Sequence, residues 1–104
     1  MLVGRLQATL AALLTALALA GCASVEETMI ERGFPPAYAE GYDDGCASGN
    51  EAGGRLFGEA RKDANRYATD GQYAQGWNEG FASCKNNAEA MVRDARLRNP
   101  SRDK

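Results

Sequence analysis

Three cysteines, Cys22, Cys46 and Cys84, carry the most nucleophilic side chains of this 104-residue chain. A thiolate can form a thioether, pair with a second thiol in a disulfide, or bind a metal ion. The sequence has no histidine, the side chain that most often activates a cysteine or completes a zinc site. It also lacks a Gly-x-Ser-x-Gly elbow and a Walker-type loop. We therefore predict no catalytic residues and expect the cysteines to form structural covalent bonds.

Cys22 ends a segment with the pattern of a secretion signal. Arg5 precedes an apolar run from Leu10 to Ala20, which is too short for a stable transmembrane helix. The run closes as Leu19-Ala20-Gly21-Cys22, which resembles the lipobox of bacterial lipoproteins. The resemblance implies cleavage before Cys22 and attachment of diacylglycerol and an N-acyl chain to its thiol and amine. Two or more acyl chains anchor a protein to a membrane almost permanently.

The residues after Cys22 bear on sorting between membranes. Ala23 and Ser24 follow it, whereas an Asp at the second position of such lipoproteins commonly retains them in the inner membrane of enteric-type bacteria. The resemblance therefore implies the periplasmic face of the outer membrane. The expected partners are that membrane and another envelope protein or a second copy of this chain.

Cys46 and Cys84 remain after lipidation of Cys22. In an oxidising compartment, two thiols of a small domain usually form a disulfide, so we predict this pair as a structural bridge. A redox-active pair is the first alternative, although neither cysteine lies in a CxxC motif. A metal site is the second, and it would need further ligands such as Asp43, Asp44 or Glu79.

The mature chain contains an internal repeat. Tyr38-Ala-Glu-Gly-Tyr-Asp-Asp-Gly-Cys-Ala-Ser48 aligns with Tyr73-Ala-Gln-Gly-Trp-Asn-Glu-Gly-Phe-Ala-Ser83, with six identities in eleven positions at a constant offset of 35 residues. Two copies are too few for a solenoid, so a helical pair is the simpler outcome. The pattern is similar to that of small, uncharacterised lipoproteins of Gram-negative bacteria over residues 38–88, a resemblance that implies no activity.

Glycines recur every fourth residue in these repeats. On a helix this spacing aligns them in one stripe, and each interior glycine costs about 1 kcal/mol relative to alanine. Close backbone approach or a bulky side chain seated on the stripe would recover that cost. The alternative is that the glycines mark loops. We assign a helix-packing role to Gly41, Gly45, Gly49, Gly53, Gly76, Gly80, Trp77 and Phe81.

Capping signals set the expected elements. Ser24 with Glu27, and Thr69 with Gln72, have capping-box spacing, and Pro100 ends the last helix. We predict an all-α fold, in which a short membrane-proximal helix over residues 25–32 precedes a disulfide-linked antiparallel helical hairpin. An antiparallel pair that joins Cys46 to Cys84 turns at residue 65 and places Trp77 opposite Gly53 and Phe81 opposite Gly49. The predicted divisions are signal peptide 1–21, lipidated linker 22–36, hairpin domain 37–98 with a partly helical connector 55–69, and disordered basic tail 99–104.

Composition and charge limit the function classes. The net charge is −2, and the only basic bias lies at the C-terminus, so no nucleic-acid surface is expected. That basic end is interpreted as a solvated helix terminus, with contact to an anionic lipid or wall polymer as the alternative. The sequence thus favours a non-catalytic envelope lipoprotein that displays Tyr38, Tyr42 and Tyr73 to a protein partner. The alternative is a small membrane-active or envelope-stress lipoprotein that acts on the bilayer.

Overall fold

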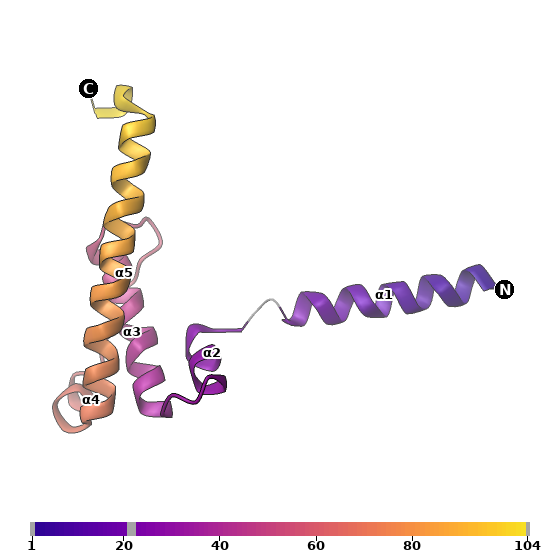
Figure 1. The fold of residues 1–104 in the computed structure, drawn as a ribbon, viewed down its shortest axis with the longest axis horizontal. Helices are drawn as coiled ribbons and strands as arrows, with labels where there is room; N and C mark the ends of the chain where they lie inside the picture. Colours follow the sequence, from indigo (N-terminus) through magenta and orange to yellow (C-terminus); the bar gives the residue numbers. More distant parts are fainter. Residues whose placement is uncertain (1, 21–22, 104) are drawn as a thin grey trace.

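The computed structural model describes residues 2–20 and 23–103, and within them every regular element is a helix (Figure 1). The elements are α1 (Leu2–Ala20), α2 (Val25–Glu31), α3 (Pro36–Ala52), α4 (Ala64–Thr69), α5 (Gly71–Arg98) and the 3-10 turn η1 (Pro100–Asp103). The prediction of an all-α chain is confirmed. Helix α1 projects away and contacts no other described element. No helix in the described ranges has both the length and the hydropathy needed to cross a membrane.

Helix α2 begins and ends where the residue types dictate. The Ser24 hydroxyl accepts from the Glu27 N–H at 3.1 Å, and the Glu27 carboxylate accepts from the Ser24 N–H, which completes a capping box. At the other end Gly33 adopts φ +93°, a conformation that residues with a Cβ rarely adopt. The N–H groups of Gly33 and Phe34 donate to Ile30 and Met29, so the helix closes in a Schellman motif.

Prolines and acidic caps define α3 and α5. Pro36 is the first residue of α3, where its missing N–H costs no hydrogen bond. The cap of α5 is Asp70, whose carboxylate accepts from the N–H groups of Gln72 and Tyr73. The predicted cap Thr69 instead donates its hydroxyl to the Asn65 carbonyl, because it belongs to the last turn of α4. Helix α5 ends at Arg98 as expected, and η1 occupies part of the tail predicted to be disordered.

Helices α3 and α5 run parallel, so the predicted antiparallel hairpin is wrong. Gly41, Gly45 and Gly49 of α3 face the backbone of Tyr73, Trp77 and Phe81 in turn, so both residue numbers rise together along the pair. Figure 1 shows the two helices side by side, both beginning at the same end. The sequence does not decide the direction, because the segment between the two helices is long enough to bring the chain back to the end where α3 begins. Such a segment permits a parallel pair as well as an antiparallel one.

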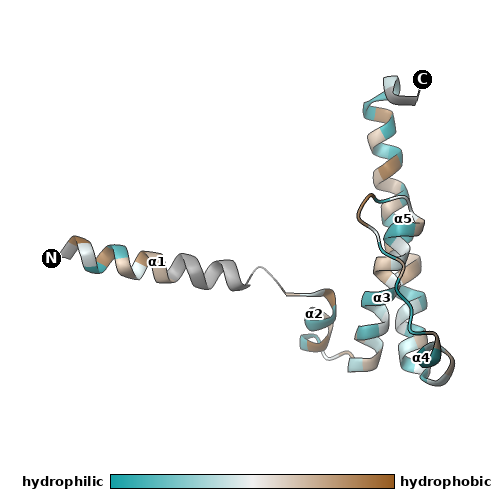
Figure 2. Cartoon of the chain, turned by 180° about the vertical axis from the view of Figure 1, so that it is seen from behind, coloured by the Kyte–Doolittle hydropathy of each residue, from teal (hydrophilic) through white to brown (hydrophobic). Residues whose placement is uncertain are grey.

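The connector between α3 and α5 brings the chain back to the end where α3 begins. From Gly53 the chain turns at Gly54, which has φ +91°, and runs back along the α3–α5 pair to α4 (Figure 2). The expectation of a partly helical segment folded over the pair agrees with this path. Its tip carries Leu56 and Phe57, which are 92% and 98% exposed.

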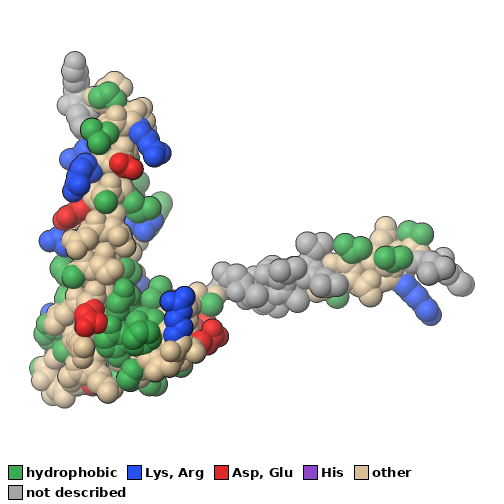
Figure 3. All heavy atoms as spheres, viewed as in Figure 1, with side chains coloured by type: hydrophobic (Ala, Val, Ile, Leu, Met, Phe, Trp, Pro, Cys, Tyr) green, Lys and Arg blue, Asp and Glu red, His purple; other side chains and the backbone are tan. Residues whose placement is uncertain are grey.

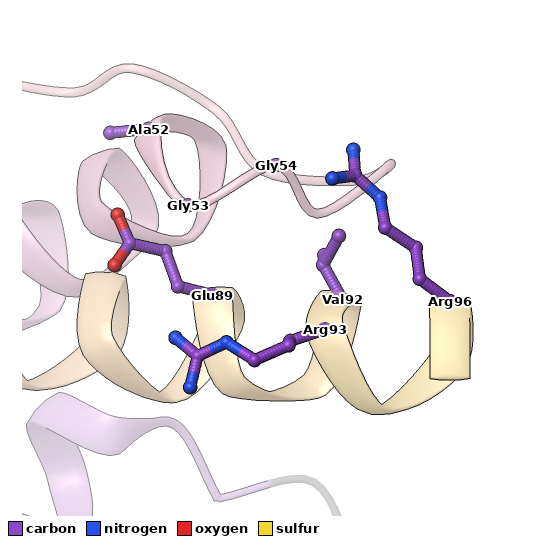
Figure 4. A pocket seen from close by; sticks show the side chains of 7 residues that line it. All are labelled: Ala52, Gly53, Gly54, Glu89, Val92, Arg93 and Arg96. Atoms are coloured by element: carbon purple, nitrogen blue, oxygen red, sulfur yellow. The ribbon is translucent and has the colours of Figure 1, made fainter. Parts of the chain in front are cut away.

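Helix α5 continues beyond the end of α3. The last close approach of α3 joins Gly53 to Lys85 and Ala88, and Gly54 then faces Val92. A shallow hollow of about 420 Å3 lies where α3 ends, with Val92 and Arg96 pointing toward the connector (Figure 4). The final turns of α5 therefore extend past α3.

Candidate functional site

The predicted packing glycines all lie in the interface between α3 and α5. A Cβ atom added to Gly41, Gly45, Gly49, Gly76 or Gly80 would overlap the main chain of the other helix, and one added to Gly53 would overlap both the Lys85 carbonyl and the Ala88 side chain. The glycines thus allow two backbones to touch, which is the first of the two roles considered for the stripe. Each of these six glycines therefore packs against the other helix of the same chain.

The aromatic residues of the stripe do not lie over the glycines as predicted. Trp77 presents its backbone to Gly45, whereas it was expected opposite Gly53. Phe81 does meet Gly49, but through its carbonyl group. The two rings stack on each other instead, with centroids 5.0 Å apart, because close helices leave no room for a ring between them.

The sequence repeat corresponds to an approximate two-fold axis between the helices. Gly41 faces Tyr73 and its repeat partner Gly76 faces Tyr38, while Gly45 faces Trp77 and its repeat partner Gly80 faces Tyr42. Each contact therefore occurs twice with the helices exchanged. A constant offset of 35 residues in the sequence produces this arrangement when the helices are parallel.

Cys46 and Cys84 form a disulfide with Cα atoms 5.1 Å apart, as predicted. The bond joins the middle of α3 to the middle of α5 and closes a loop with a sequence separation of 38. Cys22, the predicted lipid-bearing residue, lies outside the described residues. Redox and metal chemistry at Cys46 and Cys84 would require this bond to open.

One face of the α3–α5 pair holds the connector, and we call it the covered face; it carries Asp44, Ser48, Tyr73 and Trp77. The Ser48 hydroxyl bonds both the N–H and the carbonyl of Arg61, each at 2.7 Å. The Trp77 indole donates to the same carbonyl at 2.8 Å. These bonds satisfy the main chain of an extended segment that has no strand beside it.

Tyr73 completes the covered face and is fully buried, so the prediction that it is displayed to a partner is wrong. Its hydroxyl donates to Asp44 at 2.7 Å and accepts from the Asp63 N–H at 2.9 Å. Burial raises the pKa of the Tyr73 hydroxyl, and the hydrogen bond to Asp44 adds to the rise. The tyrosine thus links α3, α5 and the connector through one oxygen atom.

Basic residues of the connector also contact the covered face. The Arg61 guanidinium lies 3.9 Å from the Asp43 carboxylate and 4.0 Å from that of Asp44. The Lys62 ammonium lies 3.7 Å from the ring centroid of Tyr67 and 4.3 Å from that of Trp77. Ser48 and Arg61 have no role among the sequence predictions, although Ser48 and Ser83 end the two repeats and could have indicated a shared function.

The opposite face, which we call the open face, carries Tyr38, Tyr42, Glu79 and Ser83. The Tyr38 hydroxyl donates to the Glu79 carboxylate, as Tyr73 does to Asp44 on the covered face. Desolvation and this hydrogen bond raise the pKa of Tyr38 to about 12, and the same bond lowers the pKa of Glu79. Glu79 and Ser83 are exposed, and Tyr38 and Tyr42 are half-buried.

A groove of about 410 Å3 lies beside the open face, between α2 and α3. Phe34 stacks on Tyr38 with ring centroids 5.3 Å apart and forms part of the groove wall. The groove is lined by Ala23, Val25, Thr28, Met29, Arg32, Phe34, Tyr38 and Tyr42. Figure 3 shows hydrophobic side chains gathered where α2 meets α3. This surface can bind an apolar side chain next to hydroxyl and carboxylate groups.

The acidic residues considered as metal ligands do not meet. Asp43 and Asp44 lie near Arg61, whereas Glu79 bonds Tyr38 on the other face. Among the described residues, no three histidine, cysteine or acidic side chains come together. Scans of protein-family models, of curated proteins and of solved structures found no match to this chain.

Proposed function

We propose that this protein is a lipid-anchored lipoprotein of the cell envelope with a structural or protein-binding role. The observation that carries the binding role is the half-buried pair Tyr38 and Tyr42, which borders the groove between α2 and α3. An apolar recess edged by a few fixed polar groups is the usual form of a recognition site.

Three further observations support an anchored, exported module. The sequence around Cys22 has the lipobox pattern. Helix α1 contacts no other described element, so its removal costs the described fold no packing. The Cys46–Cys84 bond suits an oxidising compartment such as the periplasm. We propose the periplasmic face of the outer membrane as the location.

Intact mass spectrometry of protein purified from membranes tests the anchor. The wild type should lack residues 1–21 and carry two or three acyl chains, and the Cys22→Ser variant should carry none. A wild-type mass equal to the unmodified chain would overturn the lipoprotein assignment.

Photo-crosslinking in living cells tests the binding role. A photoreactive residue in place of Tyr42 should give one reproducible adduct, because this position lines the groove. The matched control is the same residue in place of Leu97, which is 73% exposed near the end of α5. Equal patterns from both positions, or none from position 42, would contradict a partner at the groove.

A second function, action on the bilayer, is favoured by the connector tip. Leu56 and Phe57 are almost fully exposed, and Phe57 lines one hollow together with Val25, three residues after Cys22. Three residues span at most about 10 Å, so an anchored Cys22 would keep this tip near the membrane. Exposed apolar side chains at such a place can enter the interface between headgroups and acyl chains.

Depth-dependent quenching separates this second function from the first. A hexahistidine tag in place of residues 1–22 would tether the chain to vesicles that contain nickel-chelating and brominated lipids. If the tip enters the bilayer, Phe57→Trp gains a strongly quenched emission that Leu97→Trp lacks. Equal quenching of the two variants would leave the tip in water and remove this candidate.

A further inference from the structure

The two faces of the α3–α5 pair carry matching side chains. Each residue of the covered face has a partner 35 positions away on the open face, because the repeat and the approximate two-fold axis exchange the helices. The matched pairs are Ser48 with Ser83, Asp44 with Glu79, Tyr73 with Tyr38, and Trp77 with Tyr42.

On the covered face these four positions bind an extended segment of the chain itself. Ser48 and Trp77 bond the main chain of Arg61. The Tyr73 hydroxyl accepts a hydrogen bond from the N–H of Asp63, two residues further along the segment. The carboxylate of Asp44 lies near the Arg61 guanidinium. The segment runs antiparallel to both helices, as Figure 2 shows.

On the open face no described part of the connector lies over the matched positions, and Tyr38 and Tyr42 instead line the groove with α2. The Tyr38–Glu79 bond reproduces the Tyr73–Asp44 bond. The hydroxyls of Ser83 and Tyr42 have no hydrogen-bond partner among the described residues, and Ser83 and Glu79 are exposed. In Figure 1 the connector lies behind the α3–α5 pair.

We propose that the open face binds an extended segment of a partner protein that carries a basic side chain. The segment runs antiparallel to α3 and α5, its main chain bonds Ser83 and Tyr42, and its basic group meets the carboxylate of Glu79. This inference rests on the proposed binding role and names the chemistry of the partner.

The differences between the two faces define what the partner must supply. Asp43 has no counterpart on the open face, because Asn78 at the matched position accepts a hydrogen bond from the Tyr67 hydroxyl of α4. One carboxylate instead of two therefore faces the basic group, and charge selectivity is weaker than on the covered face. Tyr42 replaces Trp77, and its hydroxyl can donate to a carbonyl as the indole does. The adjoining groove between α2 and α3 accommodates an apolar side chain next to the basic one.

A synthetic peptide with the sequence of residues 58–67 is the probe for this site, because it already fits the covered face. We would titrate it into isotope-labelled protein that begins at residue 23, since α1 contacts no other element among the residues that the structure describes. Amide shifts should concentrate at Tyr38, Tyr42, Glu79 and Ser83 and stay small at Ser48 and Tyr73.

Three changes test the chemistry. Replacing the arginine at the Arg61 position of the peptide by alanine should weaken binding on the order of tenfold, the effect of one charge-assisted contact. Ser83→Ala in the protein should weaken it severalfold, and the matched control Ser101→Ala should leave it unchanged. Binding unaffected by both the peptide change and Ser83→Ala would overturn the proposal.

Two other outcomes of the titration also decide against it. Shifts confined to Ser48, Trp77 and Tyr73 would mean that the peptide only displaces the connector. Absence of shifts on the open face up to the solubility limit of the peptide would mean that this face does not bind such a segment. Neither result bears on acylation of Cys22 or on the crosslinks at position 42, so these two experiments test the proposed function independently of the titration.

Discussion

Replacing Gly45 by alanine tests whether the glycine stripe exists for close helix contact. A Cβ at this position would lie 2.8 Å from the Trp77 Cα atom and still closer to its carbonyl oxygen. Ordinary contact begins at 3.4 Å, so the backbones would have to separate by at least about 0.6 Å. The atoms that must move belong to a helix main chain and cannot rotate away.

The expected sign distinguishes packing from helix propensity. Alanine in a helix interior gains about 1 kcal/mol over glycine, whereas overpacking of this kind costs about 3 kcal/mol. The net loss of about 2 kcal/mol corresponds to a melting temperature roughly 8–16 °C lower for a domain of this size. Thermal unfolding followed by circular dichroism measures the shift.

Gly71→Ala is the matched control. Gly71 also lies in a helix, α5, but a Cβ there would meet no atom within 4 Å. Alanine at position 71 should leave the melting temperature unchanged or raise it, because the free energy of unfolding increases by up to about 1 kcal/mol. A Gly45→Ala protein that melts at or above the wild-type temperature would refute the packing argument.

Cys46→Ser with Cys84→Ser should lower the free energy of unfolding by up to about 4 kcal/mol in the chain-entropy description, and an unchanged urea midpoint would contradict a structural role for the bond. Folding raises the pKa of Tyr38 from an ordinary 10.0 to about 12, so its contribution to stability is complete below pH 10 and is lost as the pH rises toward 12. In Tyr38→Phe, the free energy of unfolding should therefore change less with pH over this range. An alkaline profile identical to that of the wild type would argue against the raised pKa. In a protein whose two native cysteines are changed to serine, cysteines at positions 38 and 79 (Tyr38→Cys with Glu79→Cys) should be joined by a short thiol crosslinker. Cysteines at positions 38 and 92 (Tyr38→Cys with Val92→Cys) should not be joined. The reverse result would restore an antiparallel pair.

Local signals in the sequence were sufficient to locate α2, the start of α3 and the end of α5, but not α4. Ser24 and Glu27 form the expected capping box, Pro36 begins α3, and α5 ends at Arg98. These features depend on residues a few positions apart, so the sequence itself contains both partners. The disulfide was predictable for a different reason, because two cysteines remain after Cys22 is set aside.

Helix direction and the covered face depend on contacts that sequence spacing alone does not determine. A bond between Cys46 and Cys84 is compatible with parallel or antiparallel helices, and the choice depends on where the connector lies. That path is fixed by Ser48, Tyr73 and Trp77, which bond the main chain of Arg61 and Asp63. Such bonds have no sequence periodicity, so Tyr73 was assigned to the surface although it is fully buried.

The parallel arrangement has a consequence for binding that an antiparallel hairpin would not have. Two parallel helices in one chain require a segment that returns along their length, and this segment must lie over one face of the pair. Because the repeat makes the faces alike, the return segment occupies one of two similar surfaces and leaves the other, where Glu79 and Ser83 are exposed, free of the connector. The covered face therefore shows which main-chain and basic groups such a surface accepts, and the open face, beside α2, is where a partner of that chemistry would bind.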